Sequence, residues 1–309
     1  MQNKVLVVGS VALDDVETPF GRRDNALGGS AIYFSLAASC FARVQLVGVA
    51  GQDYPPQALA LLHRKKIDIE GLNIVPGETF RWGGKYHTDM NHRDTLYTYL
   101  NVFADFKPTI PERYRQTPFI FLGNIQPSLQ LEVLRQMQAP QFVALDTMNL
   151  WINTARSELM EVIRQVHLLM INDSELFELT NQRHLLSALS ELHHTGPRII
   201  VIKKGEHGAL LSYYKKDRNP VRNLFYAPVY PVRQATDPTG AGDSFAGGFL
   251  GYLTACSRIS FRALKKATLY GSIMGSFVVE GFGVDGLLKL NATKIDQRYR
   301  LLRRMVALK

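Results

Sequence analysis

The segment 237–249, DPTGAGDSFAGGF, sets two carboxylates among four glycines and runs into the apolar stretch LGYLTA, which predicts a helix. Small residues at Gly240, Ala241 and Gly242 leave the backbone N–H groups uncovered, and the start of a helix adds its positive dipole end. The loop therefore predicts an anion hole suited to phosphate. Asp243, in the first helical turn, would be held ionised there and could accept a proton from a hydroxyl that attacks a bound phosphoryl group. An anion hole beside a base is the arrangement that a kinase needs.

Polar residues also follow several apolar runs, at the points where buried strands would end. In open α/β sheets, ligands bind beyond the carboxyl ends of the strands, so such residues are candidates for chemistry. A helix cap is the better interpretation of any one of them alone, whereas six at one edge favour a functional site. These residues are Ser10, Asp14, Asn124, Asp146, Asn172 and Asp243.

The elements that must position these residues follow from the alternation of short apolar runs with helical stretches. Each run is apolar on both faces and is closed by Gly, Asp or Asn, as in strands buried inside a parallel sheet. The predicted strands are 4–9, 44–50, 118–123, 141–146, 166–172 and 198–205, and the helical stretches are 28–42, 54–66, 128–137, 154–165 and 185–194. Asp53 is expected to cap the second of these helices, which starts at two prolines. The series predicts an α/β fold of three layers, with a mostly parallel central sheet and helices on both faces.

Two segments, 11–25 and 77–105, interrupt this alternation. The second alternates aromatic with polar residues on either side of the polar turn MNHRD, which predicts a β-hairpin. Both segments could pair into a small accessory sheet, so we predict one domain over 1–309 with a β lid made by the two insertions. The aromatic side chains suit stacking on a planar base or, alternatively, a small hydrophobic core between lid and body. They are Trp82, Tyr86, Tyr97, Tyr99 and Phe103, together with Tyr33.

The net charge is +9, from 36 Lys and Arg against 27 Asp and Glu, but the basic residues are dispersed. Dispersed charge is typical of a solvated surface, so we expect small-molecule ligands and no nucleic-acid partner. The chain begins with a strand pattern and no apolar run reaches the length of a membrane span, so we expect no membrane association and a cytoplasmic location. Cys40 and Cys256, in apolar helical runs, are expected to be free thiols.

Other nucleotide and metal signatures do not fit the chain. The phosphate-binding pattern G-x-x-x-x-G-K-[ST] does not occur. GFGVDG, at 281–286, matches G-x-G-x-x-G, but no βαβ unit follows it. His193 and His194 end a predicted helix, and the eight histidines show no metal-ligand spacing.

The motif D-x-T-G-A-G-D-x-F is complete over 237–245, and with it the sequence resembles the ribokinase-like, or PfkB, carbohydrate kinases over nearly its whole length. Gly28 and Gly29 are similar to the paired glycines of the family's N-terminal signature. Asp14 lies five residues after Gly9, where the family's sugar-hydroxyl ligand is expected.

The resemblance extends to two further motifs and to the cofactors. NDSE, at 172–175, matches the family's N-x-x-E, so that Asn172 and Glu175 would orient Mg²⁺ largely through water. A helix cap and its capping-box partner are the alternative interpretation of this pair. KKGEHGALL, at 203–211, resembles the strand-turn-strand that runs to the nucleotide side. The implied cofactors are ATP and Mg²⁺, with a monovalent cation such as K⁺, and the implied assembly is a homodimer through the lid.

The candidate site residues fall into three groups. Asp243 would be the catalytic base, with the anion hole formed by the N–H groups of Gly240, Ala241 and Gly242. The substrate would be bound by Asp14, Gly28, Gly29, Tyr33, Asn124 and Asp146. The nucleotide would be bound by Lys203, Gly205, Thr239, Gly240 and Gly242.

The chain departs from the family at two places. Tyr33 stands where G-G-x-x-x-N has an Asn that binds sugar hydroxyls, and DTMNLW, at 146–151, lacks the Arg of D-x-N-x-R. We therefore expect a kinase for a furanose hydroxyl, with a nucleoside favoured over a free sugar. The alternative from a different functional class is a non-catalytic regulator that binds a nucleotide or metabolite. A base at Asp243 argues against this alternative.

Overall fold

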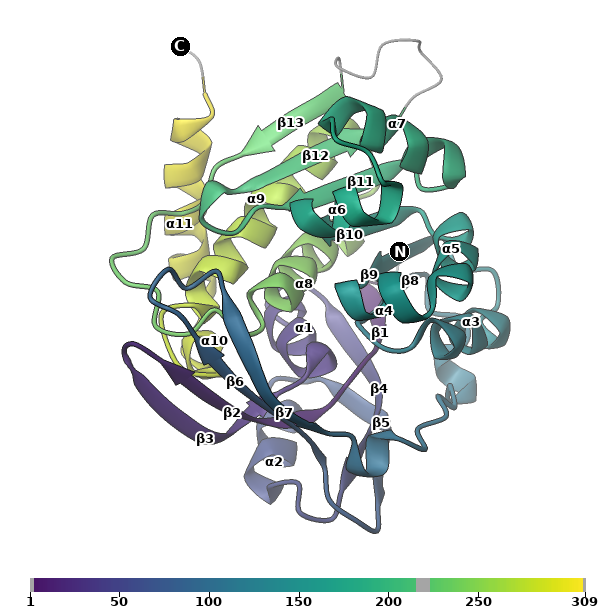
Figure 1. Ribbon diagram of the computed structural model, residues 1–309, viewed down its shortest axis with the longest axis vertical. Coiled ribbons are helices and arrows are strands. Elements are labelled where there is room, and N and C mark those ends of the chain that lie inside the picture. The colour runs from purple at the N-terminus through teal and green to yellow at the C-terminus, as the bar shows by residue number, and fades with distance from the viewer. Residues whose placement is uncertain (1–2, 215–222, 308–309) are drawn as a thin grey trace.

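The computed structural model describes residues 3–214 and 223–307, and a nine-stranded sheet runs through its centre (Figure 1). The strand order is β13-β12-β11-β10-β9-β8-β1-β4-β5, and all neighbours are parallel except in the β11–β12 and β12–β13 pairs. The strands are β1 Lys4–Val8, β4 Arg43–Gly51, β5 Asp68–Val75, β8 Phe119–Leu122, β9 Phe142–Asp146, β10 Leu168–Asn172, β11 Ile199–Lys203, β12 Ala209–Tyr213 and β13 Leu224–Ala227. The mostly parallel sheet predicted from the apolar runs is confirmed.

Different helices cover the two faces of this sheet, because successive residues of a strand point to opposite sides. In β1, Val5 and Val7 belong to one buried cluster, and Leu6 and Val8 belong to the other. The first cluster includes residues of α1, α2 and α8–α11, and the second includes residues of α3–α7. The predicted arrangement of three layers is therefore confirmed.

The helices alternate with the strands along the chain. They are α1 Ser30–Ala38, α2 Pro56–Arg64, α3 Pro127–Gln136, α4 Asn149–Thr154, α5 Arg156–Gln165, α6 Asp173–Thr180, α7 Leu185–Thr195, α8 Ala241–Thr254, α9 Phe261–Val278, α10 Asp285–Leu288 and α11 Ala292–Met305, with short 3₁₀ turns η1 Asn101–Phe103, η2 Glu112–Tyr114 and η3 Gly205–His207. Within the described residues, no helix combines the length and the apolar character needed to cross a membrane. Both thiols are free, as predicted for Cys40 and Cys256.

A second, four-stranded sheet lies beside the first (Figure 1). Its order is β3-β2-β6-β7, with two antiparallel hairpins joined by the parallel β2–β6 pair. The strands are β2 Ala12–Thr18, β3 Gly21–Gly28, β6 Phe80–Tyr86 and β7 Arg93–Tyr99. The hairpins follow the carboxyl ends of β1 and β5, so the second sheet stands at the edge where ligands of parallel sheets bind. The small second sheet of the predicted fold is thereby present.

Asp53 has a different role from the helix cap predicted for it. The residue before α2 is Pro55, and no side chain caps that helix. The Asp53 carboxylate accepts hydrogen bonds from the N–H and hydroxyl of Thr79, at 2.7 and 2.6 Å, and pairs with Arg81 of β6 at 3.3 Å. Asp53 therefore ties the end of β4 to the second sheet, since two neutral donors and a guanidinium satisfy it better than one helix terminus.

The aromatic residues predicted for the lid are divided between several places. Phe103 lies in η1 and packs against Phe80 and Phe106, with ring centroids 5.4 and 5.5 Å apart. This packing agrees with the alternative of a small hydrophobic core. Tyr86 and Tyr33 are buried, and Tyr33 belongs to α1. Of the predicted aromatic residues, Trp82, Tyr97 and Tyr99 keep exposed surface on the second sheet.

Candidate active site

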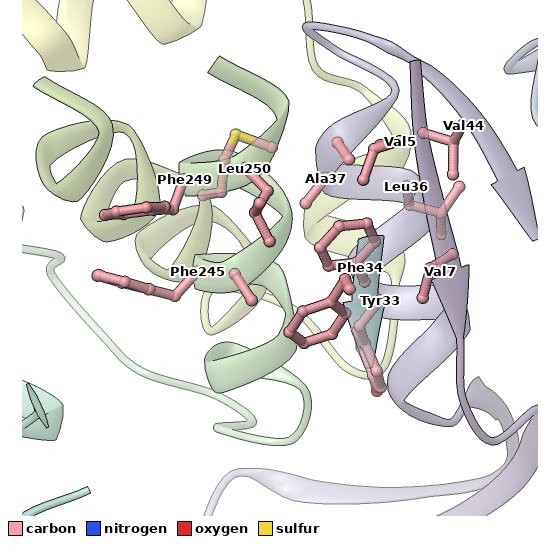
Figure 2. Packing of buried hydrophobic residues seen from close by; sticks show 14 of the residues in the cluster. Val5, Val7, Tyr33, Phe34, Leu36, Ala37, Val44, Phe245, Phe249 and Leu250 are labelled. Carbon is pink, nitrogen blue, oxygen red and sulfur yellow. The ribbon is translucent and has the colours of Figure 1, made fainter. Parts of the chain in front are cut away.

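The start of α8 carries the loop predicted to be an anion hole. Gly240, which precedes the helix, has a φ of 73°, a left-handed value that favours glycine. A Cβ added there would lie 2.3 Å from the ring of Tyr33, so this glycine also lets α1 pack directly against the loop. Figure 2 shows α1 beside α8: Tyr33 and Phe34 of α1 lie on one side of α8, whereas the rings of Phe245 and Phe249 point away from α1. The N–H of Gly242 has no acceptor among the described residues, and Gly242 lines a cavity, as expected of an anion-binding donor. The N–H of Ala241, also predicted for the anion hole, already donates to the carbonyl oxygen of Pro238 at 3.1 Å.

Asp237 fixes the shape of this loop from within the protein. It is fully buried, and its carboxylate accepts hydrogen bonds from the N–H groups of Thr239 and Gly283, both at 2.8 Å. The Thr239 hydroxyl donates to the hydroxyl of Tyr86 on β6, at 3.2 Å. The GFGVDG segment at 281–286 thus anchors the anion-hole loop through Gly283.

Asp243 lies in a cluster of charged groups just beyond this loop. Burial and the negative charge of Asp146 raise the pKa of Asp243 to about 7, while Lys203 and Arg93 act in the opposite direction. Lys203 and Asp146, at the ends of β11 and β9, form a partly buried ion pair at 2.6 Å. Burial also raises the pKa of Glu175 to about 7, and Lys203 opposes that shift too. A carboxyl group that ionises near neutral pH is well suited to accept a proton from an attacking hydroxyl.

These interactions predict how Asp146 sets the pH dependence of the reaction. The base must be ionised, so kcat/KM should rise with pH and level off above about 7. Asp146→Asn removes the charge that raises the pKa of Asp243 and frees Lys203 to stabilise its ionised form. We expect the acidic limb of the pH–rate profile to move by about 1 pH unit toward lower pH. The exposed Glu161→Gln substitution is the matched control, and an acidic limb at the wild-type position in both variants would show that Asp146 does not act on the base.

Asp14 of β2 is the second buried carboxyl group at this edge. It is 4% exposed, and a Cβ added to Gly28 would lie 1.9 Å from its Oδ2. Burial, together with the charges of Asp237 and Asp243, raises the pKa of Asp14 to about 8, and a hydrogen bond from the N–H of Gly29 opposes the shift. The paired glycines therefore have distinct roles: Gly28 leaves room for the carboxyl group and Gly29 donates to it.

Two buried phenols accompany Asp14. The hydroxyls of Tyr33 and Tyr54 have no hydrogen-bond partner among the described residues. Burial raises the pKa of both phenols, and the charge of Asp14 adds to the shift, so they remain protonated donors. An unpaired buried hydroxyl costs roughly 1–3 kcal/mol, which a ligand could recover by hydrogen bonding. Tyr54 was missed by the sequence analysis because it belongs to no motif.

Three other predicted residues have hydrogen bonds of their own. The side-chain oxygen of Asn124 accepts from the indole N–H of Trp151 at 2.9 Å. Asn172 and Glu175 form the capping box of α6: the Asn172 side chain accepts from the Glu175 N–H, and the Glu175 carboxylate accepts from the Asn172 N–H, both at 2.8 Å. In the described ranges, no three His, Cys, Asp or Glu side chains are grouped to hold a metal. The capping interpretation is therefore confirmed, and the metal role stays a prediction.

A cavity of about 440 Å³ adjoins the anion-hole loop, a size in the range of small-ligand sites. Lys203, Gly205 and Gly242 are the predicted nucleotide-binding residues that line it. The sequence analysis missed the rest of its wall, since these residues lie in irregular chain, in a turn or on one face of a helix. They include 229–235, the turn residues Asp89, Met90 and Asn91, and Ser272, Gly275, Ser276 and Val279 of the α9 region.

Arg93 at the start of β7 is a further residue that the sequence analysis missed. Its guanidinium lies over the ring of Trp82, 5.4 Å from the centroid, and its charge lowers the pKa values of Asp243 and Glu175. It falls in MNHRD, where the only sequence signal was that of a polar turn. The second sheet thus brings a cation to the carboxylates of the main sheet.

The structure gathers most of the predicted site at one edge. Charge interactions join Asp14 to Asp243, and Asp243 to Asp146 and Lys203. Glu175 belongs to the same group. Asn124 and Asn172 differ, since their side-chain oxygens are already used within the protein.

Comparisons with known proteins agree with this geometry. The family model described as "pfkB family carbohydrate kinase" matches residues 3–289. A cytidine kinase from Thermococcus kodakarensis is 30% identical over 272 residues, which cover 85% of this chain and 95% of that protein. The fold is similar to that of the nucleoside kinase from Methanocaldococcus jannaschii, with a TM-score of 0.75, 21% identity and coverage of 97% of this chain and 99% of that one. It is also similar to an aminoimidazole riboside kinase from Salmonella enterica solved with aminoimidazole riboside and an ATP analogue, with a TM-score of 0.72, 19% identity and coverage of 97% and 99%.

Proposed function

The chain belongs to the pfkB family of carbohydrate kinases, phosphotransferases with a hydroxyl acceptor, and we propose that it transfers the γ-phosphoryl group of ATP to a hydroxyl of a nucleoside. The observation that carries this proposal is the position of Asp243. This carboxyl group, with a pKa of about 7, stands in the first turn of α8, next to the N–H of Gly242, which has no acceptor among the described residues, and within charge range of Asp14. A non-catalytic binding protein has no need of a base at that point.

In the proposed reaction, Asp243 accepts the proton of the attacking hydroxyl. The hydroxyl oxygen forms a bond to the γ-phosphorus as the bond from that phosphorus to the β–γ bridging oxygen breaks, and ADP leaves with the bridging oxygen. The N–H of Gly242 and the positive end of α8 stabilise charge on the transferred group. Lys203 and Arg93 add two positive charges, which offset the repulsion between the phosphates and the carboxylates of the site.

Mg²⁺ fits the residues present at Glu175. One carboxylate oxygen of Glu175 is used in the capping box, and the other has no donor among the described residues. Carboxylate oxygen and water are the ligands that Mg²⁺ prefers. Bound there through water, the ion would neutralise phosphate charge. The monovalent cation remains part of the proposal, to be tested by exchanging K⁺ for Na⁺ in the assay.

The acceptor side favours a riboside. Asp14, Tyr33 and Tyr54 offer one carboxyl group and two phenols to a polar ligand, while Tyr33 replaces the Asn expected for a free sugar. Trp82 keeps an exposed ring on the second sheet, where a base could stack. Relatives named for cytidine and for aminoimidazole riboside support the same class of acceptor.

The proposal includes the second sheet as a lid on a single domain over 1–309. Its position at the carboxyl ends of β1 and β5 supports that role. The exposed apolar side chains of Leu96, Tyr99 and Leu100 support a homodimer formed through the lid, because such a patch is usually covered. Free thiols at Cys40 and Cys256 support a reducing, cytoplasmic location.

A substrate panel tests the proposed acceptor. With ATP and Mg²⁺, we expect ADP release with at least one of cytidine, adenosine, inosine and guanosine, and weaker or no turnover of ribose, fructose and myo-inositol. Saturable phosphorylation of a free sugar alone would refute the nucleoside acceptor and leave the kinase intact. ADP release with none of these compounds would refute the proposed reaction.

A further inference from the structure

The turn between β6 and β7 is held by its own hydrogen bonds. The carboxylate of Asp89 accepts from the N–H groups of Asn91 and His92, at 3.1 and 3.0 Å, and also bonds the ring of His92. Below this turn, Nε2 of His87, the residue after β6, lies 2.9 Å from Oδ2 of Asp94 on β7. The hairpin tip, defined here as Asp89, Met90 and Asn91, is therefore a shaped element that can present its side chains in fixed positions.

The hairpin tip reaches the main body of the protein. The side-chain amide of Asn91 donates to Oε1 of Glu206 at 3.4 Å. Gly205, beside it, has a φ of 54°, and a Cβ added there would lie 3.2 Å from Oδ1 of Asn91. This contact falls in the turn that directly follows β11, the strand that ends in Lys203. The second sheet thus touches the body on the side predicted to bind the nucleotide.

The hairpin tip also forms part of the cavity beside the anion hole. Asp89, Met90 and Asn91 line it together with Lys203 and Gly242. Nearer the base of the hairpin, Arg93 acts on Asp243. One hairpin therefore borders the cavity with its tip and the carboxylate cluster with its stem.

We propose that the hairpin tip is a binding element for the donor nucleoside triphosphate, so that the Asn91–Glu206 contact and the bound nucleotide stabilise each other. The inference rests on the proposed function, in which this cavity holds ATP. The acceptor residues Asp14 and Gly28 belong to the same sheet, through the β2–β6 pair. Donor binding thereby favours one position of the second sheet, which also carries the acceptor residues. Because such coupling is reciprocal, acceptor binding would strengthen donor binding by the same factor.

Direct binding of a non-hydrolysable ATP analogue, adenylyl imidodiphosphate with Mg²⁺, tests the inference without turnover. Asn91→Ala removes the contact from the sheet side and Glu206→Ala removes it from the body side. We expect each to weaken binding of the analogue by about 3–10-fold, as for the loss of one hydrogen bond, with no further loss in the double variant. Glu161→Ala, at an exposed position on α5, is the matched control and should bind as the wild type does.

Trp82 reports on the hairpin in the same experiment, because the chain has two tryptophans and only Trp82 lies on β6. In a Trp151→Phe background, the analogue should change the Trp82 emission, and Asn91→Ala should reduce that change. Equal affinity in all variants, or an emission that the analogue leaves unaltered, would overturn the inference while the kinase stands. A wild-type protein that does not bind the analogue at all would refute the proposed function as well.

Discussion

Asp243→Asn should lower kcat by about 10²–10⁴-fold, the usual loss when a general base is removed. The amide keeps the shape of the side chain but cannot take the proton of the attacking hydroxyl. The N–H groups of the α8 terminus remain, so affinity for the ATP analogue should stay within about 2-fold of wild type. Single-turnover rates and analogue binding, measured side by side, separate these effects. A variant that turns over at half the wild-type rate or faster would falsify the assignment of the base.

The stability of the same variant distinguishes a chemical effect from misfolding. The folded-state pKa of Asp243, about 7, lies above the ordinary value of 3.8, so the folded wild type holds the proton more tightly than the unfolded chain. Stability is therefore lost as the pH rises from about 4 through about 7. Asn has no proton to lose, so at pH 8 the variant should melt at the wild-type temperature or above it. A melting temperature well below wild type would attribute the lost rate to damage of the fold.

Gly28→Ala should reduce kcat/KM for the acceptor by about 100-fold, since a displacement of about 1 Å at a positioning group can cost that much. The added Cβ would lie 1.9 Å from Oδ2 of Asp14, so the carboxyl group must move. The backbone of Gly28 has no left-handed φ, so the effect is steric. Binding of the ATP analogue should be unchanged, because the anion hole lies on α8.

A double variant checks this explanation. If Gly28→Ala acts by displacing Asp14, then it should add little to the loss caused by Asp14→Ala alone. Kinetics of the two single variants and the double variant give the comparison. Fully additive losses would mean that Gly28 contributes by another route.

The main sheet could be predicted from the sequence because its signals are local. Each buried strand is a short apolar run, and alternate residues such as Val7 and Val8 of β1 supply the two clusters. Strand ends then meet at one edge in any parallel sheet, which brings Asp146 of β9 and Lys203 of β11 into one site without further information. The glycines before Asp243 predicted the geometry of the helix start for the same local reason.

The parts that could not be predicted depend on contacts between distant segments. Arg93 acts on Asp243 only because β6 pairs with β2, and that pairing leaves no pattern in the residues near Arg93. Tyr54 likewise belongs to no motif. Its hydroxyl is a candidate hydrogen-bond donor to a ligand because it is buried within charge range of Asp14. For Asp53, a local rule predicted a helix cap, but its hydrogen-bond donors are Arg81 of the second sheet and Thr79, the residue before that sheet's strand β6.

The division between two sheets separates the residues of the proposed reaction by origin. Asp243, Asp146 and Lys203 come from the main body, whereas Asp14 and Gly28 come from the hairpin inserted after β1, and Arg93 comes from the hairpin inserted after β5. Among the described strands, the two sheets share no pairing, so we expect substitutions or length changes in those insertions to leave the register of the nine-stranded sheet unchanged. Selection can therefore alter which acceptor is bound, one insertion at a time, while Asp243, Asp146 and Lys203 stay fixed. Proteins with this architecture can therefore change their substrate during evolution while they keep the same reaction.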